Sequence, residues 1–258
     1  MNLGIENKNV LITGGSRGIG REISIAFAKE GANVTIIARN KKDLKNTVQT
    51  LNANPGEHRY YEKDLLENGS VINLFPNILK KQSFDIIVHN LGGGLGIKDP
   101  LSDVNDWNKV WYFNVGIALE INNLIIPLMK KNKWGRIVHI SSISALSGGP
   151  KIKPYGGSPP YSAAKAYLNN YVKSLGRELA IHNIIVTALM PGAILSQGKH
   201  WDRLQKENPK LVNDFLTNYY SLGRFGHAKE IAPFAVFLAS EQASFASSAI
   251  INLDGGAI

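Results

Sequence analysis

Hydrophobic and polar positions follow two alternating patterns along the chain. Short apolar runs rich in β-branched residues alternate with longer amphipathic segments of helical period. Strands separated by helices of ten or more residues form βαβ units, so the pattern predicts a parallel sheet. Runs such as Ile86–Val88 are apolar at successive positions, as expected for a sheet covered on both faces. The predicted strands are Asn9–Thr13, Asn33–Ala38, His58–Tyr61, Asp85–His89, Arg136–Ser141, Ile184–Leu189 and Ala249–Leu253. The predicted helices are Gly18–Lys29, Lys41–Leu51, Ser70–Lys80, a long one within Asp103–Lys131, Tyr161–Ile181 and Lys229–Ala239.

Two segments interrupt this alternation. Gly148–Pro160 holds four Gly and four Pro in 13 residues, which predicts a loop. Gln197–Tyr220 is a mostly polar segment, expected to be a helical insert before the last helix. Neither segment resembles a linker, so we expect one domain over residues 1–258.

Composition narrows the class of protein. Hydrophobic residues make up 44% and charged residues 19% of the 258 positions, which is typical of a globular chain. The absence of cysteine excludes a disulfide scaffold, a thiolate metal site and a cysteine nucleophile. The six histidines are scattered without the spacing of a metal-binding pair, so no metal site is predicted.

Charge and hydropathy suggest neither a nucleic-acid nor a membrane partner. The formal net charge is +9, but no basic stripe with interleaved aromatics or recognisable binding element accompanies it. We therefore expect no nucleic acid. The start of the chain lacks the apolar run of a signal peptide, and the apolar stretch 124–129 is far shorter than the ~20 residues of a membrane span. We expect a cytoplasmic protein with no membrane partner.

A glycine-rich turn, Thr13–Gly20, follows the first strand and opens the first helix. Glycines let a phosphate approach the backbone closely, and a helix N-terminus offers free N–H groups and a positive dipole end. The glycines stand in a TGxxxGIG pattern, in which the chain resembles the short-chain dehydrogenase/reductase family. The family resemblance extends in order through further motifs: Asp64-Leu65, Asn90-Leu91-Gly92, Pro191-Gly192, Ser196 and Asp254-Gly255-Gly256. His89 and Leu91 depart from the family's usual Asn-Asn-Ala-Gly.

The resemblance implies an α/β fold of the doubly wound Rossmann type, with a seven-stranded parallel sheet in the order 3-2-1-4-5-6-7. It also implies a nicotinamide dinucleotide cofactor. The residues expected to bind that cofactor are Gly14, Ser16, Arg17, Gly18, Ile19, Gly20, Arg39, Asp64, Leu65, Asn90, Gly92, Tyr161, Lys165, Pro191, Gly192, Ile194 and Ser196.

The end of the second strand favours NADP(H) over NAD(H). An NAD site usually places an acid there for the ribose 2′-hydroxyl, whereas an NADP site omits the acid and supplies arginine for the 2′-phosphate. Ala38 stands in the acid's place, Arg39 follows it, and Arg17 in the glycine turn is a second candidate. A planar guanidinium binds phosphate in a bidentate manner.

Tyr161 and Lys165 match the family's catalytic pair. Residues four apart share a helix face, so an ammonium should lie near the phenol and lower its pKa from about 10. The resemblance implies that Tyr161 is the general acid for carbonyl reduction and that Lys165 also holds the nicotinamide ribose. It aligns Ser142 with the catalytic serine, Ser141 being the alternative. Asn114 matches the asparagine that holds a water in the family's proton relay.

These residues predict an NADP(H)-dependent oxidoreductase acting on a ketone or secondary alcohol. A noncatalytic NADP(H)-binding or scaffold protein is the alternative reading. The substrate remains open between a 3-oxoacyl thioester and a keto-sugar, and Lys98, Lys151 and Lys153 in the bordering loops would favour an anionic one. The insert at about 197–220 resembles the family's substrate lid. The resemblance also implies a homo-oligomer, a tetramer or dimer, formed through the helices around 103–131 and 161–181 and the C-terminal strand.

Overall fold

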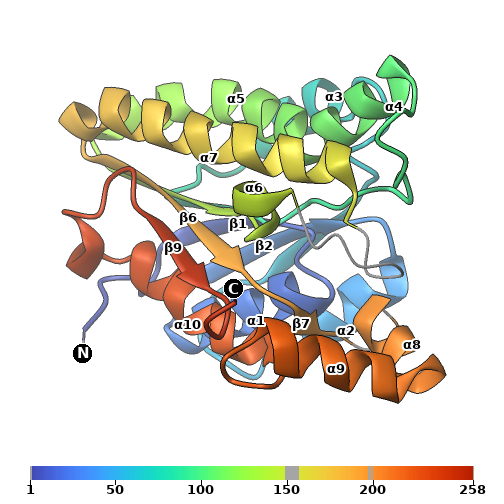
Figure 1. The fold of residues 1–258 in the computed structure, drawn as a ribbon. Coiled ribbons are helices and arrows are strands. Elements are labelled where there is room, and N and C mark those ends of the chain that lie inside the picture. Colours follow the sequence, from blue (N-terminus) through green and yellow to red (C-terminus); the bar gives the residue numbers. More distant parts are fainter. Residues whose placement is uncertain (1, 149–156, 197, 199, 258) are drawn as a thin grey trace.

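The computed structural model describes residues 2–148, 157–196, 198 and 200–257. A seven-stranded parallel sheet runs through its centre in the order β3-β2-β1-β4-β5-β6-β9, which confirms the expected strand order (Figure 1). The strands are β1 (Asn9–Thr13), β2 (Asn33–Ala38), β3 (Arg59–Glu62), β4 (Ile86–His89), β5 (Gly135–Ile140), β6 (Ile184–Pro191) and β9 (Ile250–Leu253). Two short strands, β7 (Ile194–Leu195) and β8 (Gly226–His227), pair separately in parallel.

Helices cover both faces of the sheet. One layer holds α1 (Gly18–Lys29), α2 (Lys41–Leu51) and α10 (Ala228–Leu238). The other holds α3 (Ser70–Leu79), α4 (Val104–Trp111), α5 (Ile117–Asn132) and α7 (Pro159–Leu179). Three further helices lie beside the carboxyl ends of the strands: α6 (Ser144–Ser147), α8 (His200–Glu207) and α9 (Pro209–Tyr219).

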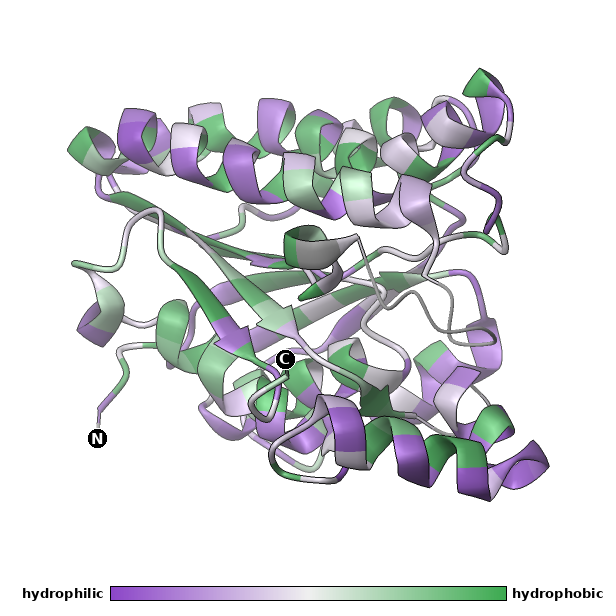
Figure 2. Cartoon of the chain, in the orientation of Figure 1, coloured by the Kyte–Doolittle hydropathy of each residue, from purple (hydrophilic) through white to green (hydrophobic). Residues whose placement is uncertain are grey.

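Successive strand residues supply the two sides of the core. Val10 and Ile12 of β1 pack toward α1 and α10, whereas Leu11 between them packs toward α3 and α5. All three side chains are fully buried, and burial of each contributes about 1.5–3 kcal/mol. In Figure 2 the central strands are largely hydrophobic, whereas the helices combine hydrophobic and hydrophilic residues. Burial of both faces explains the continuous apolar runs in the sequence.

The long helix expected within 103–131 is interrupted. Its α4 and α5 portions are joined by a π-helical turn at Tyr112–Gly116. The combined stretch Val104–Asn132 is long and apolar enough to cross a membrane by length and composition. In the structure, half of its most apolar window is buried, and Ile121 and Ile125 pack against the sheet as in a core helix.

Several predicted boundaries need correction. The loop predicted over 148–160 ends earlier, because α7 begins at Pro159. Prolines suit the first helical positions, where no N–H partner exists, and the Ser158 hydroxyl accepts the Tyr161 N–H at 3.4 Å. Residues 149–156, with Lys151 and Lys153, lie outside the described residues. β3 is shifted by one residue from the predicted 58–61, and other ends differ by one or two residues. The insert contains the helices α8 and α9, as expected.

Candidate functional site

A cavity of about 660 Å³ opens at the carboxyl ends of the parallel strands. Its wall is built from segments that follow β1, β2, β3, β4, β5 and β6. Open α/β sheets bind ligands at this edge, beside the point where the strand order reverses. The volume falls within the range of about 300–1,000 Å³ typical of small-molecule and cofactor sites.

The glycine turn forms one wall of this cavity. Gly14 and Gly18 have φ angles of 68° and 53°, in the region that favours glycine. No side chain caps α1, whose first turn therefore keeps open N–H groups beside the cavity. A Cβ added to Gly18 would project toward Ser196 across the cavity, 3.4 Å from its hydroxyl oxygen. The glycine turn thus leaves open space beside its backbone, which a side chain at position 18 would fill.

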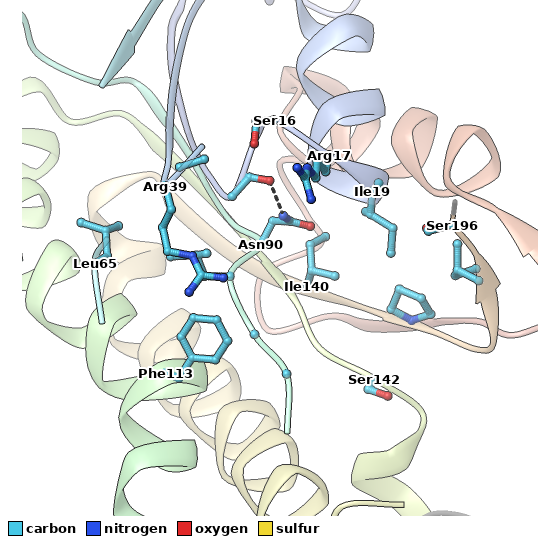
Figure 3. Close-up of a pocket in the computed structure, with 18 of the residues that line it drawn as sticks. Ser16, Arg17, Ile19, Arg39, Leu65, Asn90, Phe113, Ile140, Ser142 and Ser196 are labelled. Carbon is cyan, nitrogen blue, oxygen red and sulfur yellow. Dashed lines mark hydrogen bonds between the residues drawn. The ribbon is translucent and has the colours of Figure 1, made fainter. Parts of the chain in front are cut away.

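Asn90 ties the end of β4 to the glycine turn. Its side-chain amide donates to the carbonyl oxygens of Thr13 at 3.2 Å and Gly14 at 3.1 Å, and Figure 3 draws a hydrogen bond from this side chain. Gly20 does not line the cavity, although it was expected to bind the cofactor. A Cβ there would lie 2.3 Å from the Gly14 oxygen, so Gly20 serves close packing under the turn.

Basic and acidic side chains share the end of the cavity beyond β2. Arg17 and Arg39 both line it, and Figure 3 shows Arg39 on the opposite side of the view from Ser142 and Ser196. Ala38, the last residue of β2, leaves this end without an acid at that position. Arg17 binds Asp43, and Arg39 lies 3.4 Å from the Asp64 carboxylate.

Lys165 lies one turn after Tyr161 on α7 and is almost fully buried, with 2% of its surface exposed. Its ammonium donates to the Ile140 carbonyl oxygen at 2.7 Å and lies 5.6 Å from the centre of the Tyr161 ring. Burial lowers the pKa of Lys165 to about 7. The spacing of four residues thus brings the two side chains together on the cavity wall.

The expected fall in the Tyr161 pKa is wrong for this structure. Burial raises the pKa of the Tyr161 phenol above its ordinary value, and a hydrogen bond with Ser142 opposes that rise. Of these two effects, desolvation of the buried phenol is the larger. The phenol is therefore protonated at neutral pH.

The two adjacent serines after β5 have different partners. Ser141 donates to the Asn169 side-chain oxygen at 2.6 Å and so is engaged away from Tyr161. The Ser142 hydroxyl accepts the Ser144 N–H at 3.1 Å and hydrogen-bonds to Tyr161. Both serines line the cavity, but only Ser142 has a hydrogen bond to Tyr161, as a joint role with Tyr161 in catalysis would require.

Asn114 lies behind the cavity wall, on the π-helical turn. Its amide donates to the carbonyl oxygens of Gly93 at 2.9 Å and Val110 at 2.8 Å, while its own oxygen accepts the Gly93 N–H at 3.0 Å. A Cβ on Gly92 would lie 2.6 Å from that oxygen and 2.9 Å from the Lys165 nitrogen. Asn114 therefore fixes the loop after β4 next to Lys165 and does not itself line the cavity.

The structure thus gathers the predicted site residues in one cavity wall, except Gly20 and Asn114. Sequence reasoning missed Asp43, Phe113 and Trp201, which also line it. An acid in the first turn of the helix after β2 was the one available signal for Asp43. Phe113 and Trp201 are ordinary apolar positions in the sequence. Among the described residues, no group of three or more acidic or histidine side chains is arranged to hold a metal.

Comparisons with known proteins agree with this architecture. The family pattern of the short chain dehydrogenases matches residues 8–207. The 3-oxoacyl-acyl-carrier-protein reductase of Chlamydia trachomatis is 34% identical over 252 residues, covering 97% of both chains. The L-sorbose reductase of Gluconobacter frateurii, solved with NADPH and L-sorbose, matches with a TM-score of 0.89 and 29% identity over 100% of this chain and 98% of its own. A 7α-hydroxysteroid dehydrogenase, solved with NADH and 7-oxo glycochenodeoxycholic acid, gives a TM-score of 0.86 and 29% identity over 100% and 96%.

Proposed function

The chain belongs to the short chain dehydrogenase family, and from this premise we propose that it transfers a hydride between NADP(H) and a ketone or secondary alcohol. Members of this family are oxidoreductases acting on CH–OH groups. The observation that carries the proposal is the meeting of Ser142, Tyr161 and Lys165 on the wall of the cavity that the glycine turn also lines.

The residues present fit a nicotinamide dinucleotide. The uncapped α1 terminus and the open space beside Gly18 suit a pyrophosphate, and Arg17 and Arg39 suit a 2′-phosphate. The adenine would lie against Asp64 and Leu65. The nicotinamide and its ribose would be held by Asn90, Gly92, Tyr161, Lys165, Pro191, Gly192, Ile194 and Ser196. When bound, NADP(H) supplies or accepts the hydride.

The remaining chemistry belongs to this chain. Tyr161, whose pKa is raised further by burial, holds the proton that the carbonyl oxygen receives during reduction. The Ser142 hydroxyl donates a hydrogen bond to that oxygen and stabilises its developing negative charge. Lys165 would return a proton to the phenol, and Asn114, which like Lys165 lies beside Gly92, would hold the water that resupplies Lys165. In the oxidation direction Tyr161 first gives its proton to Lys165, and the resulting phenolate then accepts the proton of the alcohol.

The substrate is a carbonyl compound or alcohol admitted beside α8 and α9. One relative is a 3-oxoacyl-acyl-carrier-protein reductase and one structural neighbour a sorbose reductase, so we retain a 3-oxoacyl thioester and a keto-sugar as candidates. We assign α8 and α9 as the substrate lid, because Trp201 of α8 lines the cavity. Lys98, beside the cavity loop, would favour an anionic substrate.

We further propose that residues 1–258 form one domain and that the protein is a cytoplasmic homo-oligomer, a tetramer or a dimer. Large exposed apolar side chains support self-association, since such groups commonly mark interaction surfaces. They include Tyr167 of α7 and Phe234 and Phe237 of α10.

Replacing Tyr161 by Phe tests the catalytic assignment. We expect kcat in an NADPH-coupled carbonyl reduction to fall by about 10²–10⁴-fold, because the proton donor is lost. The affinity for NADPH, followed by its fluorescence, should change less than about threefold, since the ring is kept. The substrate panel should contain 3-oxoacyl thioesters and keto-sugars. Tight NADPH binding with no turnover of any carbonyl or alcohol by the wild type would instead support the noncatalytic alternative.

Replacing Arg39 by Asp tests the choice of dinucleotide. The Kd for NADPH should rise by about tenfold or more, because a guanidinium facing the 2′-phosphate becomes a carboxylate. The Kd for NADH should change little. Arg59→Asp is the matched control, since this exposed arginine pairs with Glu57 away from the cavity. An unchanged NADPH/NADH preference in Arg39→Asp would exclude Arg39 from the phosphate site.

A further inference from the structure

Asp43 holds one of the two cavity arginines. It lies in the first turn of α2, where its backbone N–H is accepted by the Asn40 side chain at 2.9 Å. Its carboxylate receives the side-chain N–H of Arg17, and about a fifth of its side chain is exposed, against 58% for Arg17. Because both residues line the cavity, this ion pair forms part of the cavity wall.

The second cavity arginine also has an acidic neighbour, but that pair is looser. Arg39 lies 3.4 Å from Asp64, whose carboxylate also accepts the Leu66 N–H at 3.0 Å. Asp64 is thus anchored by its own turn, whereas Asp43 points its charge at Arg17. A third cation at this end, Lys63, pairs with Glu67, which does not line the cavity.

We infer that Asp43 is a specificity-determining residue that competes with the 2′-phosphate of NADP(H) for Arg17. It thereby reduces the ratio by which the site binds NADP(H) more tightly than NAD(H). The inference rests on the proposed function. Carboxylate and phosphate are alternative ligands for the same guanidinium donors, so the phosphate must displace Asp43 to engage Arg17 fully. The displaced carboxylate then faces a phosphate of like charge at the same end of the cavity.

The NAD(H) ribose has no phosphate and leaves the Arg17–Asp43 pair intact. Asp43 therefore opposes one of the two dinucleotides and is neutral toward the other. The end of β2 provides no acid at Ala38, but Asp43, five residues later, supplies one to the cofactor pocket. A helix-stabilising role alone, through the favourable position of an acid in a first turn, would affect both dinucleotides equally.

Binding measurements on Asp43→Asn test this inference without any catalytic readout. Isothermal titration with NADPH, NADH and 2′,5′-ADP would be performed on the wild type and the variant. We expect the Kd for NADPH and for 2′,5′-ADP to fall by about 3–10-fold, because the competing charge is removed from a partly exposed ion pair. The Kd for NADH should change by less than about twofold. Raising the salt concentration should shrink the difference between wild type and variant.

Two controls separate this effect from general changes. Glu57→Gln removes a carboxylate from the exposed Arg59–Glu57 pair, neither residue of which lines the cavity, and should leave all three affinities unchanged. Asp43→Ser, with an uncharged side chain suited to a first helical turn, should reproduce the gain of Asp43→Asn, and thermal melting confirms that both variants fold. An unchanged or weakened NADPH affinity in both Asp43 variants, or an equal shift for NADPH and NADH, would overturn the inference alone. Failure of the wild type to bind either dinucleotide would overturn the proposed function together with it.

Discussion

His89 and His139 are two imidazoles buried side by side under α7. They are register partners in β4 and β5, and their rings stack 4.7 Å apart. The Nε2 atom of His89 lies 2.9 Å from the Asn122 side-chain oxygen, while neither ring nitrogen of His139 has a partner among the described residues. Burial lowers the pKa of His89 to about 4 and that of His139 well below its ordinary value, to which nearby Lys165 also contributes. Both are neutral in the folded protein at physiological pH.

This pair predicts a loss of stability in mild acid. The unfolded chain takes up protons on these histidines near pH 6.5, whereas folded His89 does so only near pH 4. The two neutral imidazoles therefore make their full contribution to the free energy of unfolding above pH 6.5. This contribution declines toward pH 4, by about 1.4 kcal/mol per pH unit for each histidine. For His89 the total amounts to about 3 kcal/mol. Urea unfolding between pH 7.5 and 4 measures this loss of stability.

The variant His89→Asn should show a shallower fall in the free energy of unfolding over this pH range. Asparagine does not titrate and keeps an amide for Asn122. The partly exposed His182 supplies the matched control, so His182→Asn should follow the wild-type slope. Identical slopes for wild type and His89→Asn would show that the buried imidazole does not limit stability in acid.

At the scale of elements, α8 and α9 form a small apolar cluster of their own. Phe215 of α9 stacks on Trp201 of α8 with ring centres 4.7 Å apart, and Trp201 also contacts Phe225 at 5.3 Å. This cluster is distinct from the two clusters that fill the faces of the sheet. Since local openings follow such cooperative units, the two helices should be able to open while the sheet remains folded.

Replacing Phe215 by Ala should therefore loosen α8 and α9, the proposed lid, and leave the sheet intact. We expect hydrogen exchange in residues 200–219 to accelerate and KM for the carbonyl substrate to rise about threefold or more, with little change in Tm. The matched control is Phe75→Ala, which removes a fully buried ring from the main core and should cost about 3–5 kcal/mol of global stability. A fall in Tm for Phe215→Ala comparable to that of Phe75→Ala would show one cooperative unit.

At the scale of the whole molecule, one edge of the sheet carries exposed aromatic side chains. β9 is the terminal strand of the sheet, and its residues are at most half-buried. Phe245, just before β9, is fully exposed, and Phe234 and Phe237 of α10 are about 40% exposed. An edge strand with apolar neighbours is open to pairing with another chain. This surface extends the expected oligomer contacts beyond the helices around 103–131 and 161–181 to α10.

Light scattering at micromolar concentration should therefore show a homo-oligomer. The variant Phe237→Ser should weaken its assembly, because a buried aromatic contact would be replaced by a polar one. Ile72→Ser provides a control, since Ile72 is exposed on α3, far from β9 in the strand order. A monomeric wild type would contradict the proposed assembly, and an Ile72→Ser variant that dissociates as much as Phe237→Ser would place the interface elsewhere.

Much of the fold and site follows from local sequence alone. The apolar periods specify the strands and helices because burial on one or both faces dictates the residue pattern, and the glycine turn needs backbone angles that few residues adopt. The pairing of Tyr161 with Lys165 follows from helix geometry. The short strands β7 and β8 and the π-helical turn were not predictable, since two-residue strands and a single wider turn leave no periodic pattern.

The pKa values and ion pairs of the site residues were decided only by the tertiary structure. The spacing of Tyr161 and Lys165 establishes proximity, but burial by distant segments sets both pKa values and reverses the expected direction for the phenol. Likewise, Asp43 and Arg17 lie 26 positions apart and meet only because β2 returns the chain beside β1. Residue types and spacing therefore determined which chemistry the chain carries. The packing of segments remote in sequence decided how that chemistry is charged, because solvent exclusion and long-range ion pairs belong to the folded chain as a whole.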